Sequence, residues 1–420
     1  MSGRKKAPNL KDSLDAFFLA ANAAVVKTKA QLDAVFKAQN FWMHNGFTFE
    51  VTDDFASTLR DVVAGVVKSE GPAKVNRKQI QEIALDIATS QSSNKTKDFN
   101  AAIKGEVAKK YERIEPCFAV ALNGVKAIKL GRVTIERSID VANELNKPNA
   151  RWQIRPNVPP SSQIEKNVFI VGLPAVVWRV KVECFKGNVR DVAAWYIDVA
   201  LSLLRLSIPS DKIVGNSPGF GSIEAAPTQS LQRKEYGISL AGTGVSFGGS
   251  SLDGWYEVTS KTFGPKKRQK LDILAAQLMN PTKGSVAERF ANGLGWLTRG
   301  RRASDQAERF LHFFTAIESL LTRSDKNAPV TDTICRGVAC ILARKLQFRA
   351  SIAKEMAELY ATRSELVHAG ERKVSEEESL ALQIRSELVF YNVLKKIDMS
   401  KRLDDFHNEL KVASYGVLWP

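Results

Sequence analysis

The sequence predicts an α+β fold: a mixed N-terminal and middle region followed by a C-terminal all-α bundle. In the first and last thirds, apolar residues recur at helical spacing. In residues 176–185 they alternate with charged residues, as in a half-buried strand. The chain has 420 residues, of which 44% are hydrophobic, enough for two or three domains. We therefore expect a mostly helical region over 1–150, a mixed α/β region over 151–280 and a helical domain over 281–420.

The first region reads as a series of helices that gives way to strands. Apolar residues at helical spacing predict helical structure between Leu14 and Phe36. Near Cys117 the period changes, and a segment rich in Pro, Asn and Ser at 148–162 indicates a boundary loop. The further segments expected here are helices at 53–68, 77–90 and 99–113, then strands at 118–130 and 133–137.

The middle region combines strands, one helix and a glycine-rich stretch. An apolar run at 168–171 and the alternation at 176–185 predict strands, and 189–206 predicts an amphipathic helix. The glycines of 215–255 lack the Gly-Lys-Ser/Thr ending of a phosphate-binding loop, so we expect turns and hairpins. The basic run 266–270 is compatible with a nuclear import signal, a basic loop near RNA or a solvated linker.

From about residue 285 the sequence predicts five helices with short connections, which is typical of a bundle. Capping residues mark several of the helix starts. Ser304 with Asp305 and Thr331 with Asp332 precede apolar stripes, and Ser375 with Glu378 forms a capping box.

Composition narrows the class of partner. The formal net charge of +16 is spread over all three regions and favours an anionic partner, with nucleic acid first. A basic protein without such a role is the alternative. The four cysteines form no C-x-x-C pair, so we expect free thiols rather than zinc ligands or disulfides. No apolar run is long enough to cross a membrane, and we expect a soluble cytoplasmic protein.

One pair of residues near the end of the fourth helix points to chemistry on RNA. Arg363 precedes His368 by five residues. A guanidinium fits phosphate oxygens, and an imidazole can move a proton near neutral pH, so the pair could act on a phosphodiester without a metal. Arg402 and His407 repeat the spacing beyond the last long helix, and we interpret this second match as coincidence.

Residues from about 285 to 397 resemble the HEPN superfamily, specifically its ApeA-like branch. The resemblance rests on three passages: residues 290–302 followed by the helix 307–321, the helix around Arg344, and residues 363–370, which fit the family's R-x4-6-H signature. It implies a helical bundle that dimerises and a metal-independent ribonuclease at the dimer interface. Members act in phage defence, toxin–antitoxin pairs and related responses, and some are inactive binding modules.

The resemblance and the residue chemistry together give a set of site residues. His368 would move the proton and Arg363 would stabilise charge as the RNA 2′-hydroxyl attacks phosphorus, leaving a 2′,3′-cyclic phosphate. The alternative is a structural histidine at an interface, with Arg363 paired to a nearby carboxylate. Glu318 could orient Arg363 or another cation, and the alternative is an ordinary half-exposed glutamate. Ser364 stands where many family members carry Asn, Asp or His, and we give it a supporting role. We expect no metal and no cofactor. Candidate RNA contacts are Arg299, Arg301, Arg302 and Trp296, although a solvated helix end would look the same.

The expected function is a dimeric HEPN endoribonuclease whose first 280 residues sense a phage-derived trigger or bind a regulatory partner. The alternative is a non-catalytic HEPN dimer that binds RNA or a partner protein. A DNA-binding regulator also fits the charge, but no recognition helix supports it.

Overall fold

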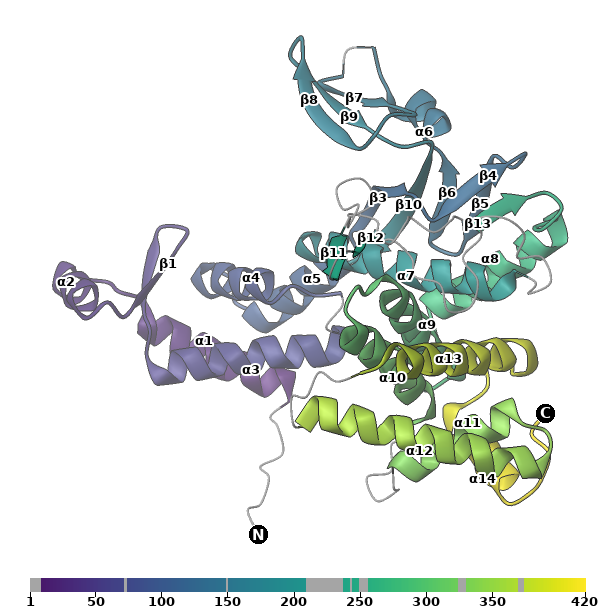
Figure 1. Cartoon of the computed structure of the whole chain (residues 1–420). Helices are drawn as coiled ribbons and strands as arrows, with labels where there is room; N and C mark the ends of the chain where they lie inside the picture. The colour runs from purple at the N-terminus through teal and green to yellow at the C-terminus, as the bar shows by residue number, and fades with distance from the viewer. Residues whose placement is uncertain are drawn as a thin grey trace. The chain divides into compact units, whose positions relative to one another are not determined.

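The computed structural model describes residues 9–71, 74–148, 150–208, 237–241, 244–248, 256–323, 330–368 and 374–420 (Figure 1). The chain forms two compact units, one made of residues 1–113 and 181–194, the other of 114–180 and 195–420. The boundaries expected after residues 150 and 280 both fall inside the second unit. The units are thus interleaved in sequence, because the chain leaves the first unit after residue 113 and returns to it for residues 181–194.

The first unit is helical around an aromatic core that includes Phe17, Phe55 and Phe99. A hairpin of β1 and β2 turns at Asn45 and Gly46, both with positive φ, as an Asn-Gly turn requires. The helices expected at 53–68 and 77–90 are confirmed, whereas the hairpin was not predicted. The elements are α1 (Leu10–Ala24), α2 (Lys29–Ala38), β1 (Phe41–His44), β2 (Phe47–Glu50), α3 (Asp53–Glu70), α4 (Arg77–Thr89) and α5 (Lys95–Val107).

The sheets of the second unit lie in its first part. One sheet has the order β3-β10-β6-β5, and another has the order β7-β9-β8 beside α6. The strand expected at 176–185 is confirmed as β10, but the loop expected at 148–162 contains β7. The elements are β3 (Lys110–Cys117), β4 (Val120–Asn123), β5 (Ala127–Leu130), β6 (Val133–Arg137), α6 (Ser138–Leu145), β7 (Trp152–Arg155), β8 (Ser161–Glu165), β9 (Val168–Gly172) and β10 (Val176–Glu183).

Helix α7 (Val189–Ser207) confirms the amphipathic helix, and the glycine-rich stretch contributes a hairpin of β11 (Gly237–Ala241) and β12 (Gly244–Gly248). Six of its glycines lie outside the described residues: Gly215, Gly219, Gly221, Gly242, Gly249 and Gly254. β13 (Tyr256–Thr259) pairs with β4, and α8 spans Pro265–Met279. The basic run 266–270 therefore lies in the first two turns of a helix that begins at Pro265, not in a linker or a loop.

The C-terminal part is all helical, as expected, and adds α14 to the five predicted helices. Asp305 caps α10, and Ser375 with Glu378 forms the capping box of α13. Helix α10 packs against both α9 and α13 around Phe290, Phe313 and Phe390. The helices are α9 (Val286–Arg302), α10 (Gln306–Leu321), α11 (Val330–Leu342), α12 (Leu346–His368), α13 (Glu376–Lys396) and α14 (Leu403–Ser414). Across the described chain, no helix is both long and apolar enough to span a bilayer.

Two glycines of α9 let neighbouring rings approach its backbone. A Cβ built on Gly293 would meet the Phe390 ring at 2.1 Å, and one built on Gly295 would meet the Trp195 ring at 2.3 Å. Both distances are far below van der Waals contact. The absence of a side chain at these positions therefore sets how closely α13 and α7 pack on α9.

We expect Gly293→Ala to lower the free energy of unfolding by about 1–3 kcal/mol, because the Phe390 ring has to move within a packed core. Urea denaturation followed by circular dichroism would measure the change. Gly105→Ala is the control, because a Cβ there meets nothing within 4 Å in the interior of α5. It should stabilise its own unit by a few tenths to about 1 kcal/mol. Equal stability of the Gly293→Ala variant and the parent would contradict the packing argument.

Candidate functional site

Arg363 is held in place by a carboxylate from a second helix. It lies on α12, and its side chain is 24% exposed. Its Nη2 is 3.3 Å from Oε1 and 3.4 Å from Oε2 of Glu318 on α10, and its guanidinium carbon is 5.9 Å from the centre of the Tyr360 ring. Because the contact uses one nitrogen of a five-donor fork, other N–H groups remain for a phosphate.

Glu318 is a partly buried carboxyl, and two effects shift its pKa in opposite directions. Burial raises its pKa above the ordinary value, while the charge and hydrogen bond of Arg363 lower it, and burial is the larger effect. The expectation that Glu318 orients Arg363 fits this contact between α10 and α12. The guanidinium thus favours the charged form of the carboxyl, and the carboxyl in turn contacts the guanidinium.

His368 is the last residue of α12, and it is exposed. Since α12 is helical through both residues, a five-residue offset places Arg363 and His368 about 140° apart around the axis and about 7.5 Å apart along it. The structure does not bring the two side chains onto one face. One chain therefore presents a fixed cation and, separately, an exposed imidazole.

The residues beside the motif tie α12 to α13. Thr362 Oγ1 donates a hydrogen bond of 2.8 Å to Glu378 Oε1, and the other oxygen of Glu378 accepts from the backbone N–H of Ser375. Glu378 therefore caps α13 and fixes α12 one residue before Arg363. Ser364 is half-buried on α12, and its hydroxyl has no hydrogen bond within the described part of the chain. The sequence showed the capping box but gave no sign of the bond to Thr362.

Arg301 occupies a different environment from the one expected. Its side chain is 0% exposed and forms a forked ion pair with Glu387 of α13, with Nη2 2.8 Å from Oε2. Its Nη1 also lies 3.5 Å from the hydroxyl of Tyr256. A guanidinium with no exposed surface cannot contact RNA, so the expectation for Arg301 is corrected: it joins α9 to α13 inside the core.

The other two arginines of this group share one buried carboxylate. Arg302 Nη1 is 2.5 Å from Oδ1 of Asp198 on α7, and Arg299 Nε is 3.3 Å from Oδ2. Burial raises the pKa of Asp198, and the two guanidinium groups oppose that shift. Arg302 is 13% exposed and Arg299 41% exposed, so only Arg299 presents much surface to a ligand.

Arg299 lies between two indole rings. Its guanidinium carbon is 4.9 Å from the centre of the Trp195 ring and 5.1 Å from that of Trp296. The Trp296 ring stacks on His312 with 5.2 Å between centres. These half-exposed groups could stack on an unpaired base. Trp195 and His312 were missed, because Trp195 fits the apolar stripe of α7 and nothing local links it to α9.

The second Arg–His pair has structural partners. His407 is 5% exposed, and its Nε2 is 2.9 Å from the carbonyl oxygen of Leu320. Because a carbonyl can only accept, Nε2 carries the proton. Arg402 precedes α14 and lies 3.8 Å from Asp404. These contacts give both residues structural roles, and neither needs a catalytic one.

Burial lowers the pKa of His407 below 6.5, outweighing the hydrogen bond to Leu320. The unfolded chain therefore binds more protons than the folded one once the pH falls below about 6.5, so stability should fall there, by up to about 1.4 kcal/mol per pH unit. We expect His407→Gln to flatten this slope between pH 7 and 5, measured by urea unfolding at several pH values. The pKa of His312 is also lowered, so some slope should remain. An unchanged slope in the variant would contradict the assignment.

The cysteines are buried free thiols, and burial raises the pKa of Cys117 to about 12 and that of Cys335 to about 11. Such thiols are poor nucleophiles at neutral pH. Within the described ranges, no three His, Cys, Asp or Glu side chains gather closely enough to hold a metal ion.

Comparisons with known protein families, with curated proteins and with solved structures gave no match to this chain.

Proposed function

We propose that this protein is a metal-independent endoribonuclease of the HEPN type that acts in the cytoplasm, in phage defence or a toxin-like stress response. The observation that supports the proposal is the Arg363–Glu318 ion pair at 3.3 Å, close to the end of the helix that carries the exposed His368. Arg363 supplies a positioned, permanent cation and His368 a proton carrier, the two groups that phosphodiester cleavage needs.

The reaction proposed is transesterification within the RNA chain. His368 takes the proton of a 2′-hydroxyl, whose oxygen attacks the adjacent phosphorus and displaces the 5′-oxygen of the next nucleotide. The products are a 2′,3′-cyclic phosphate and, once the leaving oxygen gains a proton, a 5′-hydroxyl. The free donors of Arg363 stabilise the charge that develops on the phosphoryl oxygens.

A second chain completes the site in this proposal. Arg363 and His368 leave one helix about 140° apart, so a phosphate bound at Arg363 is not faced by the histidine of the same helix. A homodimer with α12 near its axis would bring Arg363 of one chain to His368 of the other, because a two-fold interface uses the same surface twice.

The test is incubation of the purified full chain with total RNA in excess EDTA. Cleavage that leaves cyclic-phosphate ends supports the proposal. Those ends resist 3′ ligation even after treatment with an ordinary phosphomonoesterase, which cannot hydrolyse a cyclic diester. They become reactive when acid opens the ring before that treatment. Loss of cleavage in EDTA, restored by Mg²⁺, would contradict the metal-independent mechanism.

The second candidate function is a non-catalytic HEPN dimer that binds RNA or a partner protein. It is favoured by the cluster of Arg299 between Trp195 and Trp296, which could hold a base without any chemistry. RNA bound by the full chain but left intact, with and without Mg²⁺, would support this function over the first.

The proposal includes control of cleavage by a phage-derived trigger or a regulatory partner. A fragment of residues 281–420 is a poor test of such control. It would remove α7, whose Asp198 holds Arg299 and Arg302 and whose Ser202 bonds Thr298. Control is better tested by assaying the full chain with and without extract from infected cells, where a rise in rate would support a trigger.

A further inference from the structure

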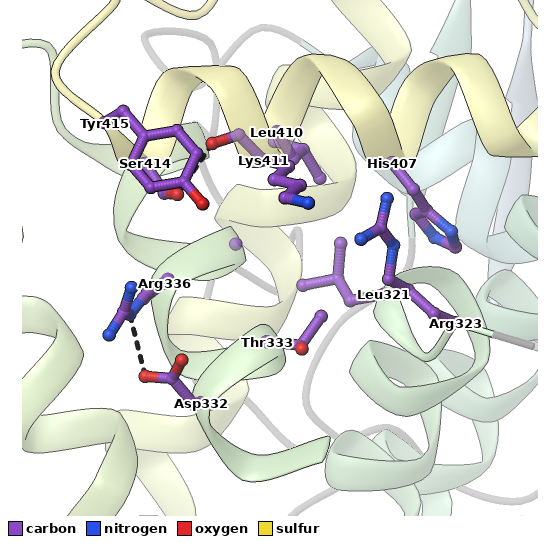
Figure 2. Close-up of a pocket in the computed structure, with 11 residues that line it drawn as sticks. Leu321, Arg323, Asp332, Thr333, Arg336, His407, Leu410, Lys411, Ser414 and Tyr415 are labelled. Atoms are coloured by element: carbon purple, nitrogen blue, oxygen red, sulfur yellow. Dashed lines mark hydrogen bonds and ion pairs between the residues drawn. The ribbon is translucent and has the colours of Figure 1, made fainter. Parts of the chain in front are cut away.

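A cavity of about 330 Å³ opens between the end of α10, the start of α11 and α14 (Figure 2). Its inner wall includes the buried side chains of Leu321 and Leu410. The charged side chains that line it come from three segments of the chain (Figure 2). These are Arg323 after α10, Arg336 and Asp332 on α11, and Lys411 on α14.

The cavity carries positive charge in excess. Arg323 Nη2 donates to the neutral amide oxygen of Asn408 at 2.8 Å, and no carboxylate among the described residues pairs with its charge. Lys411 has no ion pair among the described residues. Arg336 Nε lies 2.7 Å from Oδ1 of Asp332, one turn earlier on α11. Three cations and one carboxylate thus line the cavity, a balance that favours an anion of two charges.

Two aromatic rings line the cavity beside the charged groups. His407 is fixed by its hydrogen bond to the carbonyl of Leu320, and its lowered pKa keeps it neutral at pH 7, with Nδ1 as an acceptor. Tyr415 follows α14 and is 73% exposed. A buried acceptor and an exposed aromatic ring can contact a ribose or a base, whereas inorganic phosphate would use neither.

We infer that this cavity binds a small phosphate monoester of mononucleotide size, with the phosphate among Arg323, Arg336 and Lys411 and the remainder toward Tyr415. The volume lies at the lower end of small-molecule sites, which run from about 300 to 1,000 Å³, so one nucleotide fits better than a longer chain. The inference stands apart from the proposed nuclease, because no residue of the cavity belongs to that site.

The experiment is isothermal titration of the full chain with AMP, adenosine and inorganic phosphate. We expect AMP to bind most tightly, because it alone engages both the cations and the rings. Adenosine binding as tightly as AMP would overturn the assignment of the cations. Inorganic phosphate binding as tightly as AMP would overturn the role of the rings, and no binding of AMP at millimolar concentration would overturn the site.

Two variants with opposite expected signs sharpen the test. Lys411→Ala should weaken AMP binding by roughly tenfold or more, since it removes a charged donor. Asp332→Asn should tighten binding several-fold, since it removes the competing carboxylate from Arg336. Lys354→Ala on α12 is the control, because Lys354 is an 82% exposed lysine outside the cavity, and AMP affinity should not change. Equal affinity in the parent, Lys411→Ala and Asp332→Asn proteins would overturn the inference.

Discussion

Replacing His368 with alanine is expected to slow RNA cleavage by roughly 10²- to 10⁴-fold, the usual contribution of a positioned general acid or base. Arg363→Ala should cost about 10²- to 10³-fold, as for other groups that stabilise developing oxyanion charge. Single-turnover cleavage of an end-labelled RNA in EDTA would measure both rates. In either variant, binding of uncleaved RNA should change much less than the rate.

The chain supplies its own control for this experiment. Arg402 also lies five residues before a histidine and is 77% exposed, so Arg402→Ala removes a similar charge from the surface without touching the proposed site. Its cleavage rate should match that of the parent. If Arg402→Ala lost activity as strongly as Arg363→Ala, the effect would reflect general loss of positive charge rather than catalysis.

Mixing the two inactive variants tests whether the site spans two chains. If Arg363 of one chain works with His368 of the other, a heterodimer of Arg363→Ala and His368→Ala chains keeps one intact site. Random pairing of equal amounts should then restore about a quarter of the parent activity. No recovery, despite confirmed exchange of chains, would place both residues of a working pair on the same chain.

The largest stability effect is expected at the buried ion pair between α9 and α13. Glu387→Ala leaves the Arg301 guanidinium, which is 0% exposed, without its carboxylate. Loss of one partner of a buried pair typically costs about 3–5 kcal/mol, because the remaining charge is desolvated and uncompensated. Urea unfolding would measure the loss, and RNA cleavage should fall only as far as the folded fraction does.

A matched surface pair separates this effect from charge removal in general. Arg385 on α13 contacts Glu355 on α12 at 2.6 Å, with both side chains about one-third exposed. Because water screens such a pair, Glu355→Ala should cost no more than about 1 kcal/mol. Replacing both Arg301 and Glu387 with apolar residues should cost less than Glu387→Ala alone. Equal costs for Glu387→Ala and Glu355→Ala would contradict the burial argument.

The parts of the fold that local patterns determine were predictable. The alternation at 176–183 predicts the strand β10, and the capping box at Ser375 and Glu378 predicts the start of α13. Both signals are local, because they depend on side-chain period and on cap chemistry within a few residues. The hairpin at Asn45 and Gly46 carries an equally local turn signal that was overlooked. The helix that contains residues 266–270 was missed, because four basic residues among its first six hide the apolar period.

The candidate site was predictable only in part. Arg363, His368 and Glu318 could be proposed from sequence, and the contact between Arg363 and Glu318 agrees with that proposal. The burial of Arg301 could not, since it depends on Glu387, which lies 86 residues away in sequence. A run such as Arg-Gly-Arg-Arg does not show which arginine faces the core, because that depends on which helices cover α9.

The way α12 is packed makes it easy to recognise functional residues on it by saturation mutagenesis. Of its 23 residues, the buried ones are Arg349, Met356, Leu359 and Leu366. Most of its surface can vary without disturbing the core, unlike α9, where Gly293, Gly295 and Arg301 are each fixed by a neighbour. An exposed helix end such as His368 should tolerate nearly any substitution on structural grounds. Selection against such substitutions would therefore report directly on what the protein does.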